Sequence, residues 1–251
     1  MYSVSQICLL LTALCILTSC GGPSERIKDI EAQKTPAPTA TPTEREISGV
    51  FKVSGTAANE TEPYNGVLTV APSGDAYEFR WALNKGTFAG TGVQLGNVTA
   101  VSFARVGGGK GCGVALYRIA SDGSMEGRVA QWGEGEFGTE KATRVEGDNF
   151  PGKYLVTGHR SDGTEYEGSL AIVKDGSGYD FEWTLDAIGG HEKVGIRRVG
   201  FGIWKGSYGA VSFGGRQCSF ALYDITSNGN LEGSWGGQKS VTFGKETAKR
   251  Q

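Results

Sequence analysis

The chain has 251 residues, of which 41 are glycine and only 7 are proline. Apolar residues make up 38% of it, with 5 Trp, 9 Tyr and 11 Phe, so collagen and glycine-rich disorder are excluded. The formal net charge of −2 excludes the basic surface expected of a nucleic-acid-binding protein. The 2 histidines leave little material for a His-based metal or acid–base site, and we expect no metal and no cofactor.

Residues 1–19 are predicted to be a signal peptide, because the apolar run from Ile7 to Leu17 is shorter than the roughly 20 residues of a membrane-spanning helix. The segment Leu17-Thr18-Ser19-Cys20 resembles the lipobox of bacterial lipoproteins, in which the cysteine is acylated, for example with palmitate. This resemblance implies a mature chain that is anchored to a membrane through lipidated Cys20. Gly21 stands where an aspartate would favour the inner membrane, so we expect a lipoprotein of the outer membrane or cell surface, facing the periplasm or the exterior.

Residues 20–47 comprise this cysteine and a predicted flexible linker. The linker is rich in Pro, Thr and Ala, carries charges of both signs and has no aromatic residue. Such a composition does not bury enough apolar surface to offset the entropy lost on ordering. It would hold the folded part away from the membrane surface.

The rest of the chain consists of two copies of one sequence repeat, which predicts two β-repeat domains at 48–146 and 150–249. The segment from Cys112 (CGVALYRIASDGSMEG) matches the segment from Cys218 (CSFALYDITSNGNLEG), and Phe137-Gly138-Thr139-Glu140 matches Phe243-Gly244-Lys245-Glu246. Chance does not produce this much register, so the units are homologous. Each is long enough to bury a core of its own.

Within each unit, apolar residues alternate with polar ones, as in half-buried strands. Turn sequences such as Pro72-Ser73-Gly74 separate the runs. We expect no helix after residue 47 and about eight strands per unit, closed as a small up-and-down antiparallel meander barrel, with a two-sheet sandwich as the alternative. In the first unit the expected strands are 49–55, 64–71, 76–83, 87–94, 98–104, 112–120, 124–131 and 137–143.

The repeated segments GxYxVxG, YxGxLxI, YxxxW, CGVALY and GTE resemble a group of uncharacterised bacterial secreted proteins and lipoproteins. The resemblance covers residues 49–248, and members of the group are sometimes labelled fibronectin-binding. It implies a binding role without implying an activity. There is a looser similarity, in strand count and meander alone, to the avidin-like and lipocalin-like (calycin) barrels.

Cys112 and Cys218 occupy equivalent positions inside apolar strands. Buried free thiols are the favoured interpretation. A disulfide is the alternative, because two equivalent strands come close enough only where the units pack across a pseudo-twofold axis through that site. A catalytic cysteine is disfavoured, since the first unit contains no histidine.

Two glutamate positions recur in both units, Glu126 with Glu232 and Glu140 with Glu246. Paired carboxylates serve as acid and base in glycoside hydrolysis. We favour a structural role, in which one glutamate caps a turn and the other pairs with a basic residue or faces solvent, and we expect no catalytic residue.

The second unit carries an insertion between Leu185 and Gly200, at a place where β scaffolds often carry binding loops. Trp204 and Tyr208, with Arg197 and Arg198, are candidates for an aromatic and basic surface that contacts a protein or a glycan. A longer hairpin with Trp204 in the core is the alternative.

The sequence therefore predicts a lipid-anchored envelope protein that is a non-catalytic binding module for a protein or glycan partner. A barrel that holds a small apolar ligand is the alternative, and a glycoside hydrolase that uses the paired glutamates is the second. The binding module and the small-ligand barrel differ in interior volume, since a small-ligand barrel needs an apolar cavity of a few hundred Å³.

Overall fold

The structure, a computed structural model, describes residues 44–148, 150–187 and 195–251. The predicted signal peptide, Cys20, most of the linker and part of the insertion of the second unit lie outside these residues. In the described ranges, no helix is long and apolar enough to cross a membrane.

The described residues form sixteen strands and no helix, close to the strand positions predicted from the sequence. The strands of the first repeat are β1 (Gly49–Thr56), β2 (Pro63–Ser73), β3 (Ala76–Leu83), β4 (Gly86–Leu95), β5 (Val98–Arg105), β6 (Gly113–Ile119), β7 (Met125–Gln131) and β8 (Gly138–Glu146). Those of the second are β9 (Gly152–His159), β10 (Glu165–Asp175), β11 (Gly178–Ala187), β12 (Ile196–Lys205), β13 (Tyr208–Phe213), β14 (Ser219–Ile225), β15 (Leu231–Gly237) and β16 (Gly244–Arg250).

The strands follow from the period-two pattern. In β1, Phe51 and Val53 are buried, while Val50, Lys52 and Ser54 between and beside them are exposed. The same alternation recurs in most strands and places one row of apolar side chains inside each sheet. Tight turns join many of the strands, with glycine in the left-handed region at positions such as Gly74 (φ 58°).

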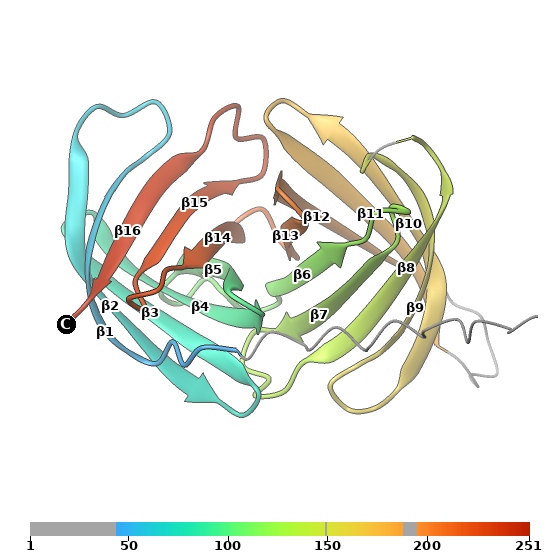
Figure 1. Cartoon of the computed structure of the whole chain (residues 1–251), viewed down its shortest axis with the longest axis horizontal. Coiled ribbons are helices and arrows are strands. Elements are labelled where there is room, and N and C mark those ends of the chain that lie inside the picture. The colour runs from blue at the N-terminus through green and yellow to red at the C-terminus, as the bar shows by residue number, and fades with distance from the viewer. Residues whose placement is uncertain (1–43, 149, 188–194) are drawn as a thin grey trace, which may run out of the picture. The chain divides into compact units, whose positions relative to one another are not determined.

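The strands close into two antiparallel eight-stranded barrels, which confirms the predicted all-β barrel fold (Figure 1). Barrel 1 has the order β1-β16-β15-β14-β5-β4-β3-β2, and barrel 2 runs through β6 to β13 in chain order, with β13 pairing β6 to close it. Closure pairs every strand on both sides, so neither barrel has an exposed edge.

The barrels do not coincide with the sequence repeats, which corrects the expected division into domains at 48–146 and 150–249. Barrel 1 takes β1–β5 from the first repeat and β14–β16 from the second, while barrel 2 takes β6–β8 and β9–β13. In Figure 1, blue and red strands therefore share one barrel. The physical reason is that β6 and β14 share the ALY segment and the same apolar pattern, so the local sequence allows either strand to pair with β5. In the structure β5 pairs with β14.

Equivalent residues of the two repeats meet where the barrels touch, which indicates a pseudo-twofold axis. The Ser102 and Ser212 hydroxyls lie 2.6 Å apart, and Cys112 forms a disulfide with Cys218. The favoured prediction of free thiols is therefore wrong, because the exchange of strands brings the two crossing segments together. The bond closes a loop with a sequence separation of 106. In the chain-entropy model, a loop of this size is worth about 4–5 kcal/mol.

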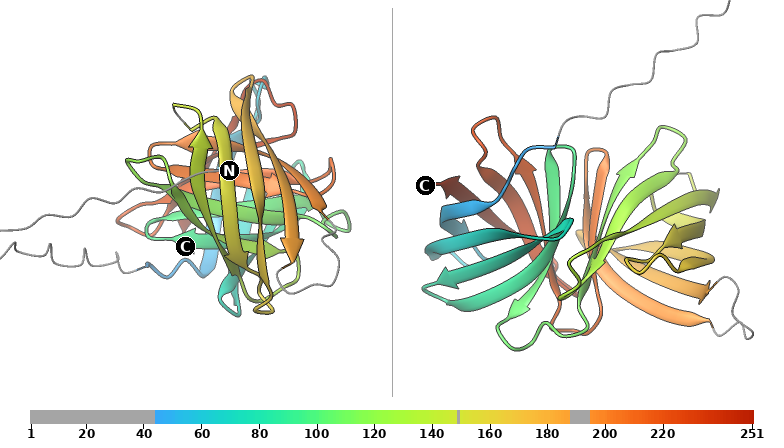
Figure 2. Two further views of the ribbon diagram at one scale, coloured as in Figure 1. Left: turned by 90° about the vertical axis from the view of Figure 1, so that its right-hand side faces the viewer. Right: turned by 90° about the horizontal axis from the view of Figure 1, so that it is seen from below.

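Each barrel has its own interior cluster of apolar side chains, and a third cluster lies between the barrels, which stand side by side in Figure 2. The third cluster is formed by outward-facing residues near the axis, among them Val93, Leu116, Phe201 and Phe220. Burying the outer faces of both sheets here explains why strands around the disulfide are apolar on both sides, as in β6, where Val114, Ala115 and Leu116 are all buried.

The exchange of strands predicts a short distance between β1 and β16. Lys52 and Lys249 are exposed and directly opposite in the register of these strands, where neighbouring Cα atoms lie about 4.5–5.5 Å apart. Nitroxide labels on Lys52→Cys and Lys249→Cys should give strong dipolar broadening in the electron paramagnetic resonance spectrum.

The matched control is the pair Lys52→Cys and Thr143→Cys, because Thr143 is exposed on β8 at the position that matches Lys249 in the repeats. It lies in the other barrel, so its spectrum should show no such broadening. Broadening in the control pair and not in the first would mean that each repeat forms its own barrel.

Candidate binding site

A buried glutamate holds the interior of each barrel together. In barrel 1, Glu246 accepts hydrogen bonds from the Tyr64 hydroxyl (2.8 Å), the Tyr223 hydroxyl (2.7 Å) and the Trp81 indole N–H (3.1 Å). In barrel 2, Glu140 accepts the same set, from Tyr117 (2.5 Å), Tyr166 (2.7 Å) and Trp183 (3.1 Å). We call these the carboxylate clusters of barrel 1 and barrel 2.

Each repeated sequence motif supplies one member of a cluster. The YxGxL segment gives Tyr64, the YxxxW segment gives Trp81, the CxxALY segment gives Tyr223, and the last strand gives Glu246. Sequence reasoning missed this role, since it placed Glu140 and Glu246 at the surface or in an ion pair. The alternation of side chains along β16 contained the signal, because Glu246 lies two residues before the buried Ala248 and therefore faces the same, inward side of the strand.

Glycines make room for the tyrosine rings. A Cβ atom on Gly55 would lie 2.4 Å from the Tyr64 ring, and one on Gly233 would lie 2.5 Å from the Tyr223 ring. Both glycines face these rings across a strand pair of barrel 1. A share of the unusual glycine content is thus required by the packing of the carboxylate clusters.

Burial raises the pKa of Glu246 above the usual value for a glutamate. The hydrogen bonds from Tyr223, Tyr64 and Trp81 act in the opposite direction, because they stabilise the ionised form, but burial is the larger effect. Burial and the nearby carboxylate likewise raise the pKa of Tyr64 and Tyr223, so both hydroxyls keep the protons that they donate.

Barrel 1 contains a cavity of about 230 Å³ that reaches this cluster. Aromatic side chains form much of its wall, with the ring centroids of Trp81 and Phe103 5.3 Å apart and those of Phe103 and Trp235 6.1 Å apart. The residues around it are Ala57, Glu60, Tyr64, Trp81, Leu83, Lys85, Phe88, Phe103, Arg105, Tyr223, Trp235 and Glu246. The cavity is larger than the roughly 150 Å³ cavity that is known to bind benzene, and smaller than most pockets for drug-sized ligands.

The interior of barrel 2 is filled differently. The guanidinium carbon of Arg198 lies 4.3 Å from the centroid of Phe213, the residue that matches Phe103. The described residues around Arg198, Tyr166 and Leu185 leave a cavity of only about 20 Å³. Within the described part of the chain, the larger interior space thus lies in barrel 1.

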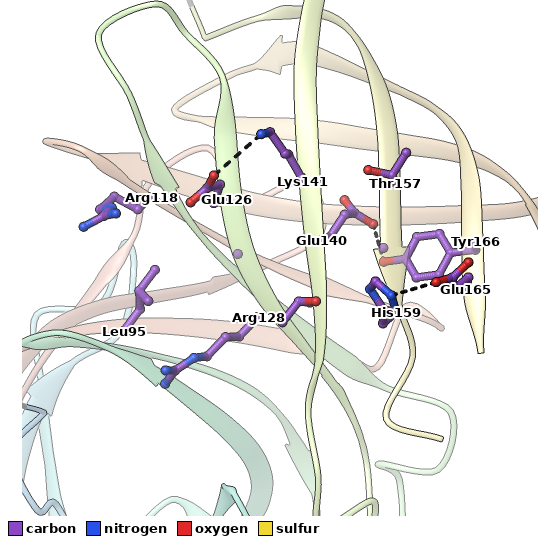
Figure 3. Close-up of a pocket in the computed structure, with 13 residues that line it drawn as sticks. Leu95, Arg118, Glu126, Arg128, Glu140, Lys141, Thr157, His159, Glu165 and Tyr166 are labelled. Carbon is purple, nitrogen blue, oxygen red and sulfur yellow. Dashed lines mark hydrogen bonds and ion pairs between the residues drawn. The ribbon is translucent and has the colours of Figure 1, made fainter. Parts of the chain in front are cut away.

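A second hollow, of about 550 Å³, runs over the outer faces of β7, β8 and β9 (Figure 3). Two ion pairs lie along it, Glu126 with Lys141 (3.9 Å) and His159 with Glu165 (3.1 Å), and Arg128 pairs with Glu44 beside it (2.7 Å). Figure 3 shows Glu140 directed to Tyr166, as part of the carboxylate cluster. The hollow is open and lined by solvated ion pairs, which makes it a weaker candidate for a small ligand than the aromatic cavity.

The predicted contact surface of Trp204, Tyr208, Arg197 and Arg198 does not form. Arg197 is exposed and makes two hydrogen bonds to Glu182, whereas Arg198 points into barrel 2. The alternation of side chains along β12 separates them, since neighbouring residues of a strand face opposite sides. Trp204 packs on Phe150 with ring centroids 3.7 Å apart, and Tyr208 packs against the cluster between the barrels.

The paired glutamates do not face one substrate either. Glu126 and Glu232 are exposed on the outer surfaces of barrel 2 and barrel 1, while Glu140 and Glu246 lie inside. The two carboxylates of each barrel are therefore on opposite sides of its wall, and this arrangement does not support the glycoside hydrolase hypothesis.

Comparisons with protein-family models, with curated proteins and with solved structures found no match. Among the described residues, no group of three or more His, Cys, Asp or Glu side chains is placed to hold a metal ion.

The raised pKa of Glu246 predicts a pH-dependent contribution to stability. Because its pKa in the folded state lies above the unfolded value of about 4.3, the favourable contribution is fully present below that value and is lost as the pH rises through the raised pKa. Relative to Glu246→Gln, the wild-type protein should therefore gain unfolding free energy when the pH falls from 7 towards 4.5, as measured by urea denaturation.

The matched control is Glu232→Gln, which removes an exposed carboxylate from the neighbouring strand. It should follow the wild-type protein across the same pH range. Parallel curves for wild type and Glu246→Gln would show that this carboxyl is not perturbed.

Proposed function

We propose that this protein is a non-catalytic binding protein that holds a small, largely apolar ligand in barrel 1. The observation that carries the proposal is the cavity of about 230 Å³, with aromatic walls and one polar cluster at Glu246. Binding sites for small molecules have this composition, with apolar walls for affinity and a few fixed polar groups for orientation. A protein or glycan partner stays a prediction, since the residues expected to contact it do not lie together.

The barrel provides a rigid container for such a ligand. Cross-strand hydrogen bonds hold the walls, and the carboxylate cluster fixes the rings of Tyr64, Tyr223 and Trp81. The site is thus preformed, and little side-chain entropy would be lost on binding. At the mouth, Lys85 forms an ion pair with Glu60 (2.8 Å), so that polar groups surround the entrance.

We further propose that the barrels stand at the outer membrane or cell surface on a lipid anchor at Cys20. The support is the lipobox resemblance and the linker composition of the sequence. Barrels held on a flexible linker would bind their ligand close to the membrane surface without inserting into the membrane.

Filling the cavity tests the ligand-binding role. Leu83 lines the cavity and is half-buried, so Leu83→Trp should place an indole in the space without removing a polar partner. Indole and toluene should quench or shift the tryptophan fluorescence of the wild-type protein and protect it in thermal unfolding. The variant should bind them at least about tenfold more weakly, a loss of about 1.4 kcal/mol.

Val67→Trp is the control, because Val67 is exposed on the neighbouring strand β2 and opposite Ala82 in register. It should bind both probes as the wild-type protein does. Equal binding by Leu83→Trp would exclude the cavity as the binding site.

The anchor is tested by Cys20→Ser, which should move the protein from the membrane fraction to the soluble fraction. Cys15→Ser, in the predicted signal peptide, is the matched control and should leave the protein in the membrane. Unchanged fractionation of Cys20→Ser would contradict lipidation at this residue.

A further inference from the structure

The two barrels share their carboxylate clusters but differ at several inward-facing positions, and one of these positions lies opposite the tryptophan of the cluster. In barrel 1, Phe88 on β4 is opposite Trp81 of the cluster, and in barrel 2, Arg198 on β12 is opposite Trp183. These residues are equivalent in the repeats, so the same site carries an aromatic ring in one barrel and a guanidinium group in the other.

In barrel 2, the chain itself supplies a cation to the interior. The Arg198 guanidinium lies over the Phe213 ring, and its charge interacts favourably with Glu140. Burial lowers the pKa of Arg198, while Glu140 and the tyrosines of the cluster act against this effect. A carboxylate cluster and an aromatic face together thus accommodate a planar organic cation in this fold.

Barrel 1 has the same acceptor without a cation beside it. Within the described residues, Glu246 forms no ion pair, and its partners are Tyr64, Trp81 and Tyr223. In place of the arginine, Phe88 adds an aromatic ring to the wall, and the ring centroids of Phe88 and Phe103 are 6.2 Å apart. Cations are attracted to the faces of aromatic rings, and desolvation strengthens this attraction to about 2 kcal/mol or more.

We propose that the ligand of barrel 1 carries an organic cation, an alkylammonium or guanidinium group, which binds between the aromatic wall and Glu246 where Arg198 lies in barrel 2. This inference rests on the proposed small-ligand function and adds the charge of the ligand to it. The cavity of about 230 Å³ takes a cation of benzylammonium size.

The cationic side chains at the entrance of the cavity would favour an anionic ligand. Lys85 and Arg105 line the entrance, and Arg105 lies 5.2 Å from the centroid of Phe88. Both residues are exposed, however, so water screens their charges, whereas Glu246 is buried. The interior therefore favours a cation more strongly than the entrance favours an anion.

Three probes that share one ring test the charge of the ligand. Benzylammonium, benzyl alcohol and benzoate should be titrated into the folded two-barrel protein, with tryptophan fluorescence and isothermal calorimetry as readouts. We expect benzylammonium to bind at least about tenfold more tightly than benzyl alcohol, and benzoate to bind most weakly. In Glu246→Gln, the preference for benzylammonium over benzyl alcohol should disappear.

Glu140→Gln makes the same substitution in barrel 2 and should leave the preference intact. A second variant, Phe88→Arg, gives barrel 1 the residue found in barrel 2 and should abolish the binding of benzylammonium.

Equal binding of benzylammonium and benzyl alcohol by the wild-type protein would overturn the cation proposal and leave the small-ligand function standing. Tighter binding of benzoate would overturn it in favour of the entrance cations. Failure of all three probes would also overturn it, and the indole and toluene titrations would then decide separately whether the cavity binds any ligand. The wild-type comparison needs no variant, so the test holds even if a substituted protein does not fold.

Discussion

In each barrel, one buried glutamate accepts hydrogen bonds from side chains that belong to both halves of the chain. Tyr64 and Trp81 come from the first repeat, while Tyr223 and Glu246 come from the second. Leaving one buried polar partner without its hydrogen bond costs about 1–3 kcal/mol. The carboxylate cluster therefore joins strands that lie far apart in the sequence, and it does so at the same place in both barrels.

The exchange of strands and the disulfide depend on the same symmetry. Barrel 2 is continuous in the chain, and its ends, β6 and β13, are paired neighbours. The chain enters barrel 2 next to Cys112 and leaves it next to Cys218, so the disulfide closes the base of an inserted barrel. Barrel 1, in contrast, is completed only when the last three strands return to β5 and β1.

The sequence predicts the strands well because each has a buried and an exposed face, as β1 shows. It does not predict which strand pairs with β5, because β6 and β14 carry the same apolar pattern and a local pattern cannot distinguish them. The carboxylate clusters were missed for a related reason, since a glutamate in an alternating strand is expected to face water. Comparing the inward positions of the repeats would have located the cluster, and Phe88 against Arg198 would have indicated the difference between the barrels.

That difference shows how two copies of one barrel can diverge without a change of fold. Burying a carboxylate is unfavourable unless donors or a cation compensate for the lost hydration. Barrel 2 uses both, because Arg198 adds a charge to the three donors. Barrel 1 keeps the donors and has Phe88 in place of the arginine, and it contains a cavity and a carboxyl whose pKa is raised by burial. Its interior is thus less well compensated than that of barrel 2, which is the condition expected where a protein gives up stability for binding. A cationic ligand would supply to Glu246 the charge interaction that Arg198 supplies to Glu140 in barrel 2.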